Sequence, residues 1–461
     1  MHKRINFAIA ALTVLALVLT ACGGAATTAA PAATSAPAAT QAPVASNVKE
    51  LTIIWAEWDP SNYLQQLGNE YEKQTGVKIT VVQEPWGTFG DRFGTEMAGQ
   101  GTSYDLVVGD SQWLGQGATL GWYVELTPQW DALNGKAYSP AAVTAYAEYP
   151  KGSGSYWAVP TEGDADGWSY RKDLFENPDE QAAFKTKYGY DLAVPKTWME
   201  LRDIAEFFTR PDKNLYGLSI YTQKDYDALT MGFENVLFSW GGAWGDYSTY
   251  KVDGILNNKT GVEALEFYKS LYAFVPPGSS NDFWQESINH FVGGEVAMAM
   301  NFFAFFPGLA NEATNPYAKS TGFFANPAGP TGVRSAALGG QGLSIVKHIS
   351  AERQAAALEF LKWFGKDESQ QLWADLGGYT CNLTVLQSDK FLNNTPYNKA
   401  FAESMTFMQD FWAVPVYGEM MANGQLFLHQ YIVEDQGTAQ ATLDKIAESH
   451  EDSLKKAGLL K

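Results

Sequence analysis

The chain has 461 residues, of which 46% are hydrophobic and 14% aromatic, which is enough for a sizeable core and for more than one domain. It carries 51 acidic and 32 basic residues, and the net charge of −19 argues against nucleic acid as a partner, because phosphates require a basic face. The same charge argues against direct docking on an anionic lipid surface.

Residues 1–22 predict export and a lipid anchor. Lys3 and Arg4 precede an apolar run that is too short for a stable transmembrane helix and that ends in the letters LTAC at Cys22. This ending resembles a bacterial lipobox, in which the cysteine becomes the lipidated N-terminus. An ordinary secretory signal with a chance cysteine is the alternative. Residues 23–47, mostly Ala, Thr and Pro, predict a disordered linker, because they cannot bury enough surface to offset their ordering entropy.

Cysteine and histidine usage predicts neither a disulfide nor a cofactor. With Cys22 assigned to the lipobox, Cys381 has no partner and is most simply a small buried apolar residue. The five histidines are scattered, with no HExxH motif and no Cys/His cluster, so a metal site is not expected. The sequence also lacks a phosphate-binding P-loop motif, which argues against an NTPase.

The first part of the mature chain predicts a mostly parallel sheet. Three apolar or β-branched runs predict strands, and two helices with a four-residue apolar spacing lie between them. We expect the first helix to be capped by Ser61 and stopped by Gly76. Together these segments form a βαβαβ unit, typical of an open sheet with helices on both faces. In chain order they are the strand 51–55, the helix with Leu64, Leu67 and Tyr71, the strand 77–82, the helix with Phe89, Phe93 and Met97, and the strand 104–108.

The remainder predicts a second set of α/β elements. A short strand at 156–160, ended by Pro160, precedes an acidic loop at 161–167, and glycines interrupt a strand at 338–346. These two strands are candidate crossings between two lobes. The other predicted elements are a helix from Thr197 with a capping box to Glu200, a helix at 261–274, a strand at 295–301, a strand from Phe323, a helix capped by Ser350, and a helical tail from Thr438.

Four motifs in this order resemble one family. They are YWAVPTEGDADGWSYRKDLF at 156–175, PKTW at 195–198, FVGGEVAMAMN at 291–301, and ALGGQGLSIVKHISAERQAAALEFLKWF at 337–364. The chain is similar to the sugar-binding extracellular solute-binding proteins of ABC importers (family 1, which includes the maltodextrin-binding proteins). The resemblance covers nearly the whole mature chain, and the order and spacing of the motifs carry it more than any single one.

The resemblance implies an α/β fold of the two-lobed type II periplasmic-binding-protein class, with a hinge of crossing strands. Lobe 1 would comprise 48–158 and 342–390, and lobe 2 would comprise 160–340 and 391–461. The ligand would lie between the lobes, beyond the carboxyl ends of the strands. The implied partners are a carbohydrate and the permease subunits of an ABC importer. The protein would be a lipid-anchored monomer at the outer face of the cytoplasmic membrane, with no cofactor and no catalytic activity.

Candidate ligand residues are those that follow predicted strands or that hold family positions. Aromatic rings suit the C–H faces of a sugar, and carboxylates and amides suit its hydroxyls. Strand ends supply Glu57, Trp58, Asp110, Trp113, Glu162, Asp164 and Trp168. The resemblance adds Trp240, Trp244, Asn301, Gly340, Gln341 and Tyr379, and it places ligand carboxylates near Asp110 and near Glu162 or Asp164.

Each candidate also has a purely structural alternative. Asp110 could cap the following helix, and Asn301 could bond the backbone. The carboxylates at 162–166 could belong to a solvated loop, and any one of the 15 tryptophans is more often core than site. Phe302–Phe306 replaces the Trp-centred run of the maltodextrin-binding proteins, so the stacking partner of the sugar differs from the family pattern.

Three functions fit the sequence. The first is a capture protein that binds a sugar and closes around it, because contacts to both lobes exist only in the closed state. The second is a secreted glycoside hydrolase, which would also use paired carboxylates, although no strand series suggests a (β/α)₈ barrel. The third keeps the fold and binds a polyamine or other cation by charge and cation–π contact.

Overall fold

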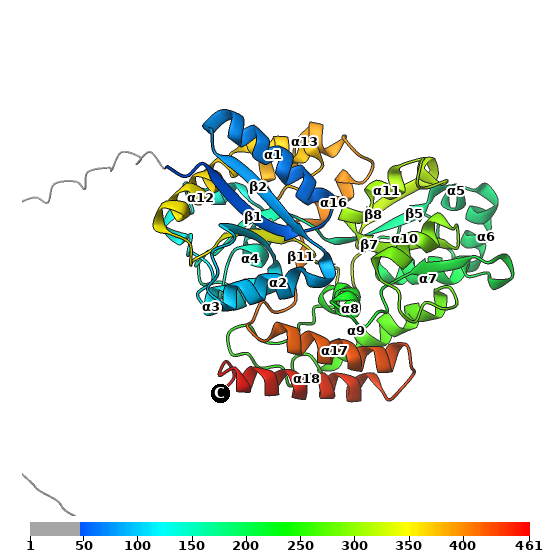
Figure 1. The fold of residues 1–461 in the computed structure, drawn as a ribbon. Helices are drawn as coiled ribbons and strands as arrows, with labels where there is room; N and C mark the ends of the chain where they lie inside the picture. Colours follow the sequence, from blue (N-terminus) through cyan, green and yellow to red (C-terminus); the bar gives the residue numbers. More distant parts are fainter. Residues whose placement is uncertain (1–46) are drawn as a thin grey trace, which may run out of the picture. The chain divides into compact units, whose positions relative to one another are not determined.

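The computed structural model describes residues 47–461, which contain two main β-sheets (Figure 1). The predicted signal and lipobox at 1–22 lie outside the described residues, as does the linker at 23–47 apart from Asn47. The mixed α/β class predicted from the sequence is confirmed. Among residues 47–461, no helix is long and apolar enough to cross a bilayer.

The first sheet has five strands in the order β2-β1-β3-β10-β4. The strands β1, β2 and β3 are parallel, as the βαβαβ pattern predicts, and β10 returns antiparallel between β3 and β4. Helices α1, α2, α4, α12 and α13 pack around this sheet (Figure 1). The bounds are β1 Glu50–Ala56, α1 Asp59–Thr75, β2 Lys78–Glu84, α2 Trp86–Ala98, β3 Leu106–Asp110, α3 Leu114–Thr119, α4 Pro140–Tyr146, β4 Val159–Glu162, β10 Gln341–Ile345, α12 Ala351–Phe364 and α13 Asp367–Leu376.

The second sheet has four strands in the order β6-β7-β5-β8. Helix α10 packs along β7, α7 along β6 and α16 along β8. The bounds are β5 Asp166–Arg171, α5 Lys172–Phe175, α6 Pro178–Tyr188, α7 Trp198–Phe208, β6 Tyr216–Ser219, α10 Trp284–Val292, β7 Val296–Phe302, α11 Pro307–Ala310, β8 Thr321–Ala325, α14 Leu383–Leu386, α15 Asp389–Leu392 and α16 Asn398–Ser404.

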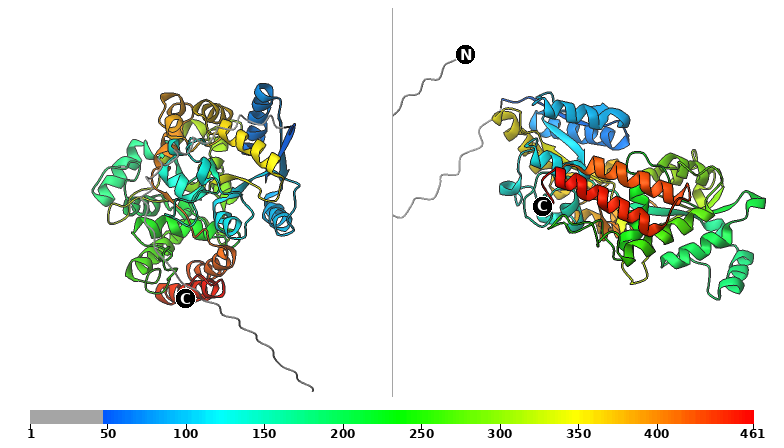
Figure 2. Two further views of the ribbon diagram at one scale, coloured as in Figure 1. Left: turned by 90° about the vertical axis from the view of Figure 1, so that its left-hand side faces the viewer. Right: turned by 90° about the horizontal axis from the view of Figure 1, so that it is seen from below.

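A helical layer lies beneath the second sheet. Helices α8 (Ala228–Ser239), α9 (Lys259–Leu271), α17 (Tyr417–Ile432) and α18 (Ala439–Lys456) pack on one another, and α17 and α18 run side by side at the C-terminus (Figure 2). Every residue of α8 is buried. Because α8 is buried on every side, including at the polar residues Glu234 and Asn235, it lacks the one-sided apolar pattern of a surface helix.

Two stretches of chain connect the sheets. Residues 163–165 join β4 to β5, and residues 338–340 join β9 (Ala336–Ala337) to β10. An antiparallel bridge between Ala165 and Leu338 ties the two stretches together, and β9 pairs with β11 (Met408–Gln409). The strands predicted as crossings, 156–160 and 338–346, also pair with each other through β4 and β10, but the first connection between the sheets lies at 163–165, just after the predicted strand.

Several predicted details differ from the structure. Ser61 is not the cap of α1: the helix starts two residues earlier at Asp59, because Pro60 favours the first turn, and the Ser61 hydroxyl donates to the Trp58 carbonyl. Pro160 does not end a strand but lies inside β4, an edge strand that needs no N–H there. The acidic stretch 161–167 is not a solvated loop, because all of it is buried in β4, β5 and the link between them.

The predicted helix caps are largely confirmed. Thr197 and Glu200 form the expected capping box of α7, and Ser350 caps α12 as expected. Thr438, where the helical tail was predicted to begin, is the N-cap of α18. Gly76 ends α1 in the left-handed conformation that glycine tolerates best. Cys381 is a free, buried cysteine, as expected.

Candidate functional site

A cavity of about 490 Å³ lies where strands of both sheets end. Its walls come from the residues after β1 and β3 of the first sheet, from the end of β7 in the second, and from the link that leads into β10. In open α/β sheets, ligands bind beyond the carboxyl ends of the strands, and this cavity lies at such a position. The lining residues are Glu57, Trp58, Trp86, Asp110, Asp164, Tyr226, Asp227, Phe283, Trp284, Phe302, Phe305, Gly339 and Gln341.

Aromatic side chains cover two sides of this central cavity. On the side of the first sheet, Trp58 and Trp86 meet edge to face with ring centroids 5.3 Å apart. On the side of the second, Trp284 and Phe305 stack at 4.6 Å with nearly parallel rings. Trp86 remains 38% exposed, which leaves part of its ring free to contact a ligand. Such surfaces suit the apolar C–H faces of a sugar ring or the positive charge of a cation.

Sheet pairing aligns three polar residues, two of which reach the cavity. Gln341 starts β10 and is paired with Asp110 on one neighbouring strand and Glu162 on the other. The Trp55 indole donates to Oε1 of Gln341 at 2.5 Å, which fixes the orientation of that amide. Asp110 and Gln341 line the cavity, whereas Glu162 lies behind it, fully buried.

Three buried carboxylates line the cavity, and each has different partners. Asp110 accepts a hydrogen bond from the Tyr226 hydroxyl at 2.7 Å. Asp164 accepts from the backbone N–H groups of Ala165 and Ala304, so it fixes the turn after β7. Asp227 precedes α8, but no helix N–H donates to its side chain, and its Oδ1 has no hydrogen-bond partner among the described residues.

Burial raises the pKa of all three carboxyls. The pKa of Asp110 rises to about 6, mainly through burial and despite the bond from Tyr226. Burial likewise raises the pKa of Asp164 and Asp227 well above the ordinary range, and the neighbouring Asp166 and Asp110, respectively, raise it further. Burial therefore favours the neutral form of these carboxyls, and a ligand that donates hydrogen bonds or carries positive charge would favour their negatively charged form.

More acidic groups lie behind the cavity wall. Glu162 accepts from the Tyr379 backbone N–H, and Asp166 accepts from the Asn235 amide, while the second oxygen of each has no partner within the described part of the chain. Burial raises the pKa of Glu162 well above its ordinary range and that of Asp166 to about 8. No cluster of three metal-ligating side chains occurs within residues 47–461.

The structure brings together five of the residues singled out in the sequence. Glu57, Trp58, Asp110, Asp164 and Gln341 line the cavity. Gly340 adjoins Gln341 in the link to β10, and its missing side chain leaves room for the Tyr146 hydroxyl.

Two other predicted residues support the lining from behind. The Asn301 amide donates to the Trp284 carbonyl, and the Tyr379 hydroxyl donates to the Phe303 carbonyl. Both side chains are buried and hold segments that carry cavity residues.

Four predicted tryptophans lie in the hydrophobic interior and do not line the cavity. Trp113 stacks on Phe93, and Trp240 packs against Phe267. Trp168 and Trp244 are fully buried, and their indole N–H groups donate to Asn326 and Glu234, respectively. Their burial agrees with the structural alternative stated for any single tryptophan.

Sequence reasoning missed about half of the lining. Tyr226 and Asp227 follow β6, a four-residue strand that gave no clear pattern, and Trp86 and Trp284 open helices whose starts were not located. One usable signal existed. Trp86 comes four residues after the predicted strand 77–82 and two residues after the observed end of β2 at Glu84, and residues that follow a parallel strand lie at the ligand-binding edge of the sheet.

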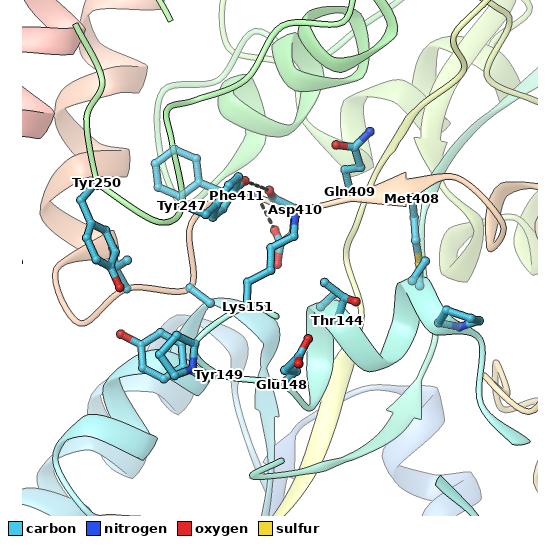
Figure 3. A pocket seen from close by; sticks show the side chains of 16 residues that line it. Thr144, Glu148, Tyr149, Lys151, Tyr247, Tyr250, Met408, Gln409, Asp410 and Phe411 are labelled. Atoms are coloured by element: carbon cyan, nitrogen blue, oxygen red, sulfur yellow. Dashed lines mark hydrogen bonds between the residues drawn. The ribbon is translucent and has the colours of Figure 1, made fainter. Parts of the chain in front are cut away.

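A second, smaller cavity of about 290 Å³ lies between α4 and the segments 247–250 and 408–414 (Figure 3). Lys151 reaches across it towards Asp410, with its ammonium 4.3 Å from the centre of the Tyr247 ring. The Tyr247 hydroxyl donates to the Asp410 carbonyl. This cavity thus contains an acid, an aromatic ring and a cation from the chain itself.

The protein has two sheets flanked by helices, with an aromatic and acidic cavity at the strand ends. This arrangement is typical of a solute-binding protein. The model of the bacterial extracellular solute-binding protein family matches residues 56–371, and the chain belongs to that family. This family binds solutes and does not catalyse reactions, so the prediction of a non-enzymatic protein is confirmed by membership.

Individual relatives agree with this assignment. A probable ABC transporter-binding protein of Deinococcus radiodurans is 26% identical over 328 residues, covering 69% of this chain and 72% of that protein. The maltose-bound MalE3 of T. maritima matches with a TM-score of 0.72 and 24% identity over 87% of this chain and 99% of that one. A ribitol complex from Agrobacterium radiobacter matches with a TM-score of 0.72 and 24% identity, covering 88% of this chain and 99% of that one. The fold is therefore that of the periplasmic sugar-binding proteins.

Proposed function

We propose that the protein captures a sugar or oligosaccharide in the central cavity and delivers it to the permease of an ABC importer. One observation carries the proposal most directly: aromatic rings on two sides of the cavity, Trp58 with Trp86 and Trp284 with Phe305, face a row of acidic and amide groups at the strand ends. Rings for the C–H faces and acceptors for the hydroxyls are what a carbohydrate requires.

Contacts from both sheets would couple binding to closure. In this proposal lobe 1, predicted as 48–158 and 342–390, carries the first sheet and therefore extends through β4 to Glu162 and resumes at Gln341. Lobe 2, predicted as 160–340 and 391–461, carries the second sheet, and the links 163–165 and 338–340 act as the hinge. A ligand that touches Trp58 from one side and Trp284 from the other gains both contacts only when the lobes approach each other. The permease would then recognise the closed form. The solved relatives include maltose, ribitol and acarbose complexes, which supports the carbohydrate class.

The lipid anchor is a separate part of the proposal. Acylation of Cys22 would hold the protein as a monomer at the outer face of the cytoplasmic membrane, because two or more acyl chains anchor stably. Replacing Cys22 by Ala should release the protein into the soluble envelope or culture fraction, and mass spectrometry of the wild-type N-terminus should show a diacylated or triacylated cysteine. If Cys22 is unmodified and the wild-type protein is found in the soluble fraction, the proposed lipid anchor is wrong, but the proposed capture function is not affected.

A melting-temperature screen over mono- and oligosaccharides tests the capture function, because a ligand that binds only the folded form stabilises it. Trp86 lines the cavity and is 38% exposed, so Trp86→Ala should reduce the rise in melting temperature that a bound sugar causes. Met199→Ala is a matched control, since Met199 is 42% exposed and lies on α7 outside the cavity. Failure of every carbohydrate to stabilise the protein, or hydrolysis of one by the purified protein, would contradict the proposal.

A further inference from the structure

The central cavity has an unusual charge pattern. Glu57, Asp110, Asp164 and Asp227 all contribute to its lining, and none of the lining side chains is a lysine, an arginine or a histidine. Asp110, Asp164 and Asp227 make no ion pair with any residue in the described range 47–461. A pocket that only had to accept hydroxyl hydrogen bonds would not require this excess of acidic side chains, since amide oxygens also accept them.

Two buried carboxylates away from the cavity lining are paired with basic side chains. Asp105, 1% exposed on its side chain, accepts two hydrogen bonds of 2.6 Å from the Arg353 guanidinium. Asp282 lies 3.0 Å from the His290 ring. Most of the buried carboxylates without a cationic partner lie at or behind the central cavity; Glu234, which accepts from the Trp244 indole, is another.

The second cavity brings the same kinds of group together with a cation from the chain itself. There the Lys151 ammonium lies over the Tyr247 ring and close to Asp410, so acid, ring and cation occur together (Figure 3). The central cavity presents acids and rings of the same kind, Asp110 and Asp227 beside Tyr226 and Trp86, but no cation from residues 47–461.

Asp227 is the group that points most clearly to a ligand. Its residue is 6% exposed, it lines the cavity, and its Oδ1 has no hydrogen-bond partner among the described residues. It does not cap α8, so helix stabilisation does not explain it. Leaving a buried carboxyl short of donors costs free energy, and a ligand that donates to the part of the Asp227 carboxyl that lines the cavity would recover some of it.

We propose that the preferred solute is a carbohydrate that carries a protonated amine, with the ammonium bound between Asp227 and Asp110 and near the Trp86 and Tyr226 rings. The inference rests on the proposed carbohydrate function and names its substrate class. An ammonium donates up to three hydrogen bonds, and its bonds to carboxylates are about twice as strong as neutral ones. It also gains cation–π attraction from rings that a neutral sugar contacts only through its C–H groups.

Matched pairs of ligands test the inference by calorimetry on the full chain. Cellobiose and the β-1,4-linked glucosamine disaccharide differ only in two hydroxyls replaced by amines, and N-acetylation of the latter removes its charge. Maltose and an aminodeoxy maltose form a second pair, and 1,5-diaminopentane supplies positive charge without a sugar. We expect the amino sugar of at least one pair to bind about tenfold or more tightly than its neutral partner.

Variants separate charge from shape. Asp227→Asn keeps the size of the side chain and should lower the ratio of amino-sugar affinity to neutral-sugar affinity about tenfold. Glu57→Gln, at an exposed position of the lining, is the second test should the buried substitution disturb folding. Asp131→Asn is the control, because the Asp131 side chain is 82% exposed and does not line the central cavity.

The outcomes distinguish the two proposals. Equal or tighter binding of the neutral sugar overturns the present inference and leaves the carbohydrate function intact. Binding of 1,5-diaminopentane with no binding of any carbohydrate, charged or neutral, overturns both. Loss of amino-sugar preference in Asp227→Asn or Glu57→Gln, with Asp131→Asn unchanged, supports the inference.

Discussion

The hydroxyl of Tyr226 donates a 2.7 Å hydrogen bond to Oδ2 of Asp110. Asp110 ends β3 in the first sheet, whereas Tyr226 lies just before α8, which packs on α9 and α17. A single side-chain hydrogen bond thus spans the cavity and connects the two parts of the molecule that supply its walls. The bond also lowers the pKa of Asp110 against the effect of burial.

Replacing Tyr226 by Phe should therefore change both affinity and its pH dependence. Without the hydroxyl the pKa of Asp110 should move above its value of about 6, so that deprotonation requires a higher pH. We expect the pH at which ligand affinity reaches half its maximum to shift upward, as measured by titration calorimetry across a pH series. Tyr247→Phe removes a similar hydroxyl bond at the second cavity and should leave the profile unchanged.

Replacing Trp284 by Ala should weaken ligand binding about tenfold with little loss of stability. Trp284 is only partly buried, and its ring stacks on Phe305 at 4.6 Å, so the substitution removes one aromatic wall of the cavity. Calorimetry against the best ligand gives the affinity, and urea denaturation gives the free energy of unfolding. An unchanged affinity would show that the ligand does not use this wall.

Replacing Trp244 by Ala should have the opposite signature. Trp244 is fully buried against Phe233 and Phe411, and its indole donates to Glu234 at 3.0 Å. We expect a loss of about 3–5 kcal/mol in the free energy of unfolding, because a large side chain leaves a cavity and a buried carboxyl loses its donor. The affinity of the remaining folded protein should change little. A selective loss of affinity would instead place Trp244 in the ligand site, as the sequence suggested.

The contrast between Trp284 and Trp244 shows where sequence reasoning succeeds. Strand patterns locate the carboxyl ends of β1 and β3, and for that reason Glu57, Trp58 and Asp110 could be named in advance. Trp244 is preceded by glycines, which can indicate that the backbone lies close to a ligand. Here the backbone lies close to other parts of the protein instead. The sequence does not distinguish a tryptophan that faces a ligand from one that faces Phe233, because both are apolar positions near a turn.

Other parts of the site depend on tertiary contacts that no local pattern encodes. Tyr226 has a positive φ of 55° and follows the short strand β6, so neither periodicity nor turn residues mark it. The stretch 161–167 appears polar and exposed in sequence, yet β10 and the second sheet bury all of it. Its carboxylates acquire their unusual character only when segments distant in sequence enclose them.

Replacing Gly340 by Ala should destabilise the link between the sheets. A methyl group there would lie 2.1 Å from the Tyr146 hydroxyl and 2.4 Å from the Glu162 carbonyl oxygen, and the backbone oxygen has little freedom to move. We expect a lower melting temperature and a weaker response to ligand. Gly308→Ala meets open space and is the control. Wild-type stability in Gly340→Ala would mean that the link adjusts freely.

Buried carboxyls also predict that the ligand-free protein loses stability as the pH rises from about 6.5 to about 8. Burial raises the pKa of Asp166 and of Asp410 to about 8, well above the unfolded value of about 3.9. The native state therefore binds more protons than the unfolded state over this range, and the free energy of unfolding falls with increasing pH. Urea denaturation at a series of pH values measures the slope.

The lower limit of that window comes from His450. Burial lowers its pKa to about 4, so the native state binds fewer protons than the unfolded state between about 4 and about 6.5, and this residue opposes the carboxyls there. Above about pH 6.5 this opposing effect of His450 ends. The raised pKa of His290 lowers the free energy of unfolding with increasing pH, as the carboxyls do. Asp166→Asn keeps an acceptor for the Asn235 amide and removes one titrating group, so it should flatten the slope. An equally steep slope in this variant would show that Asp166 is already charged in the native protein.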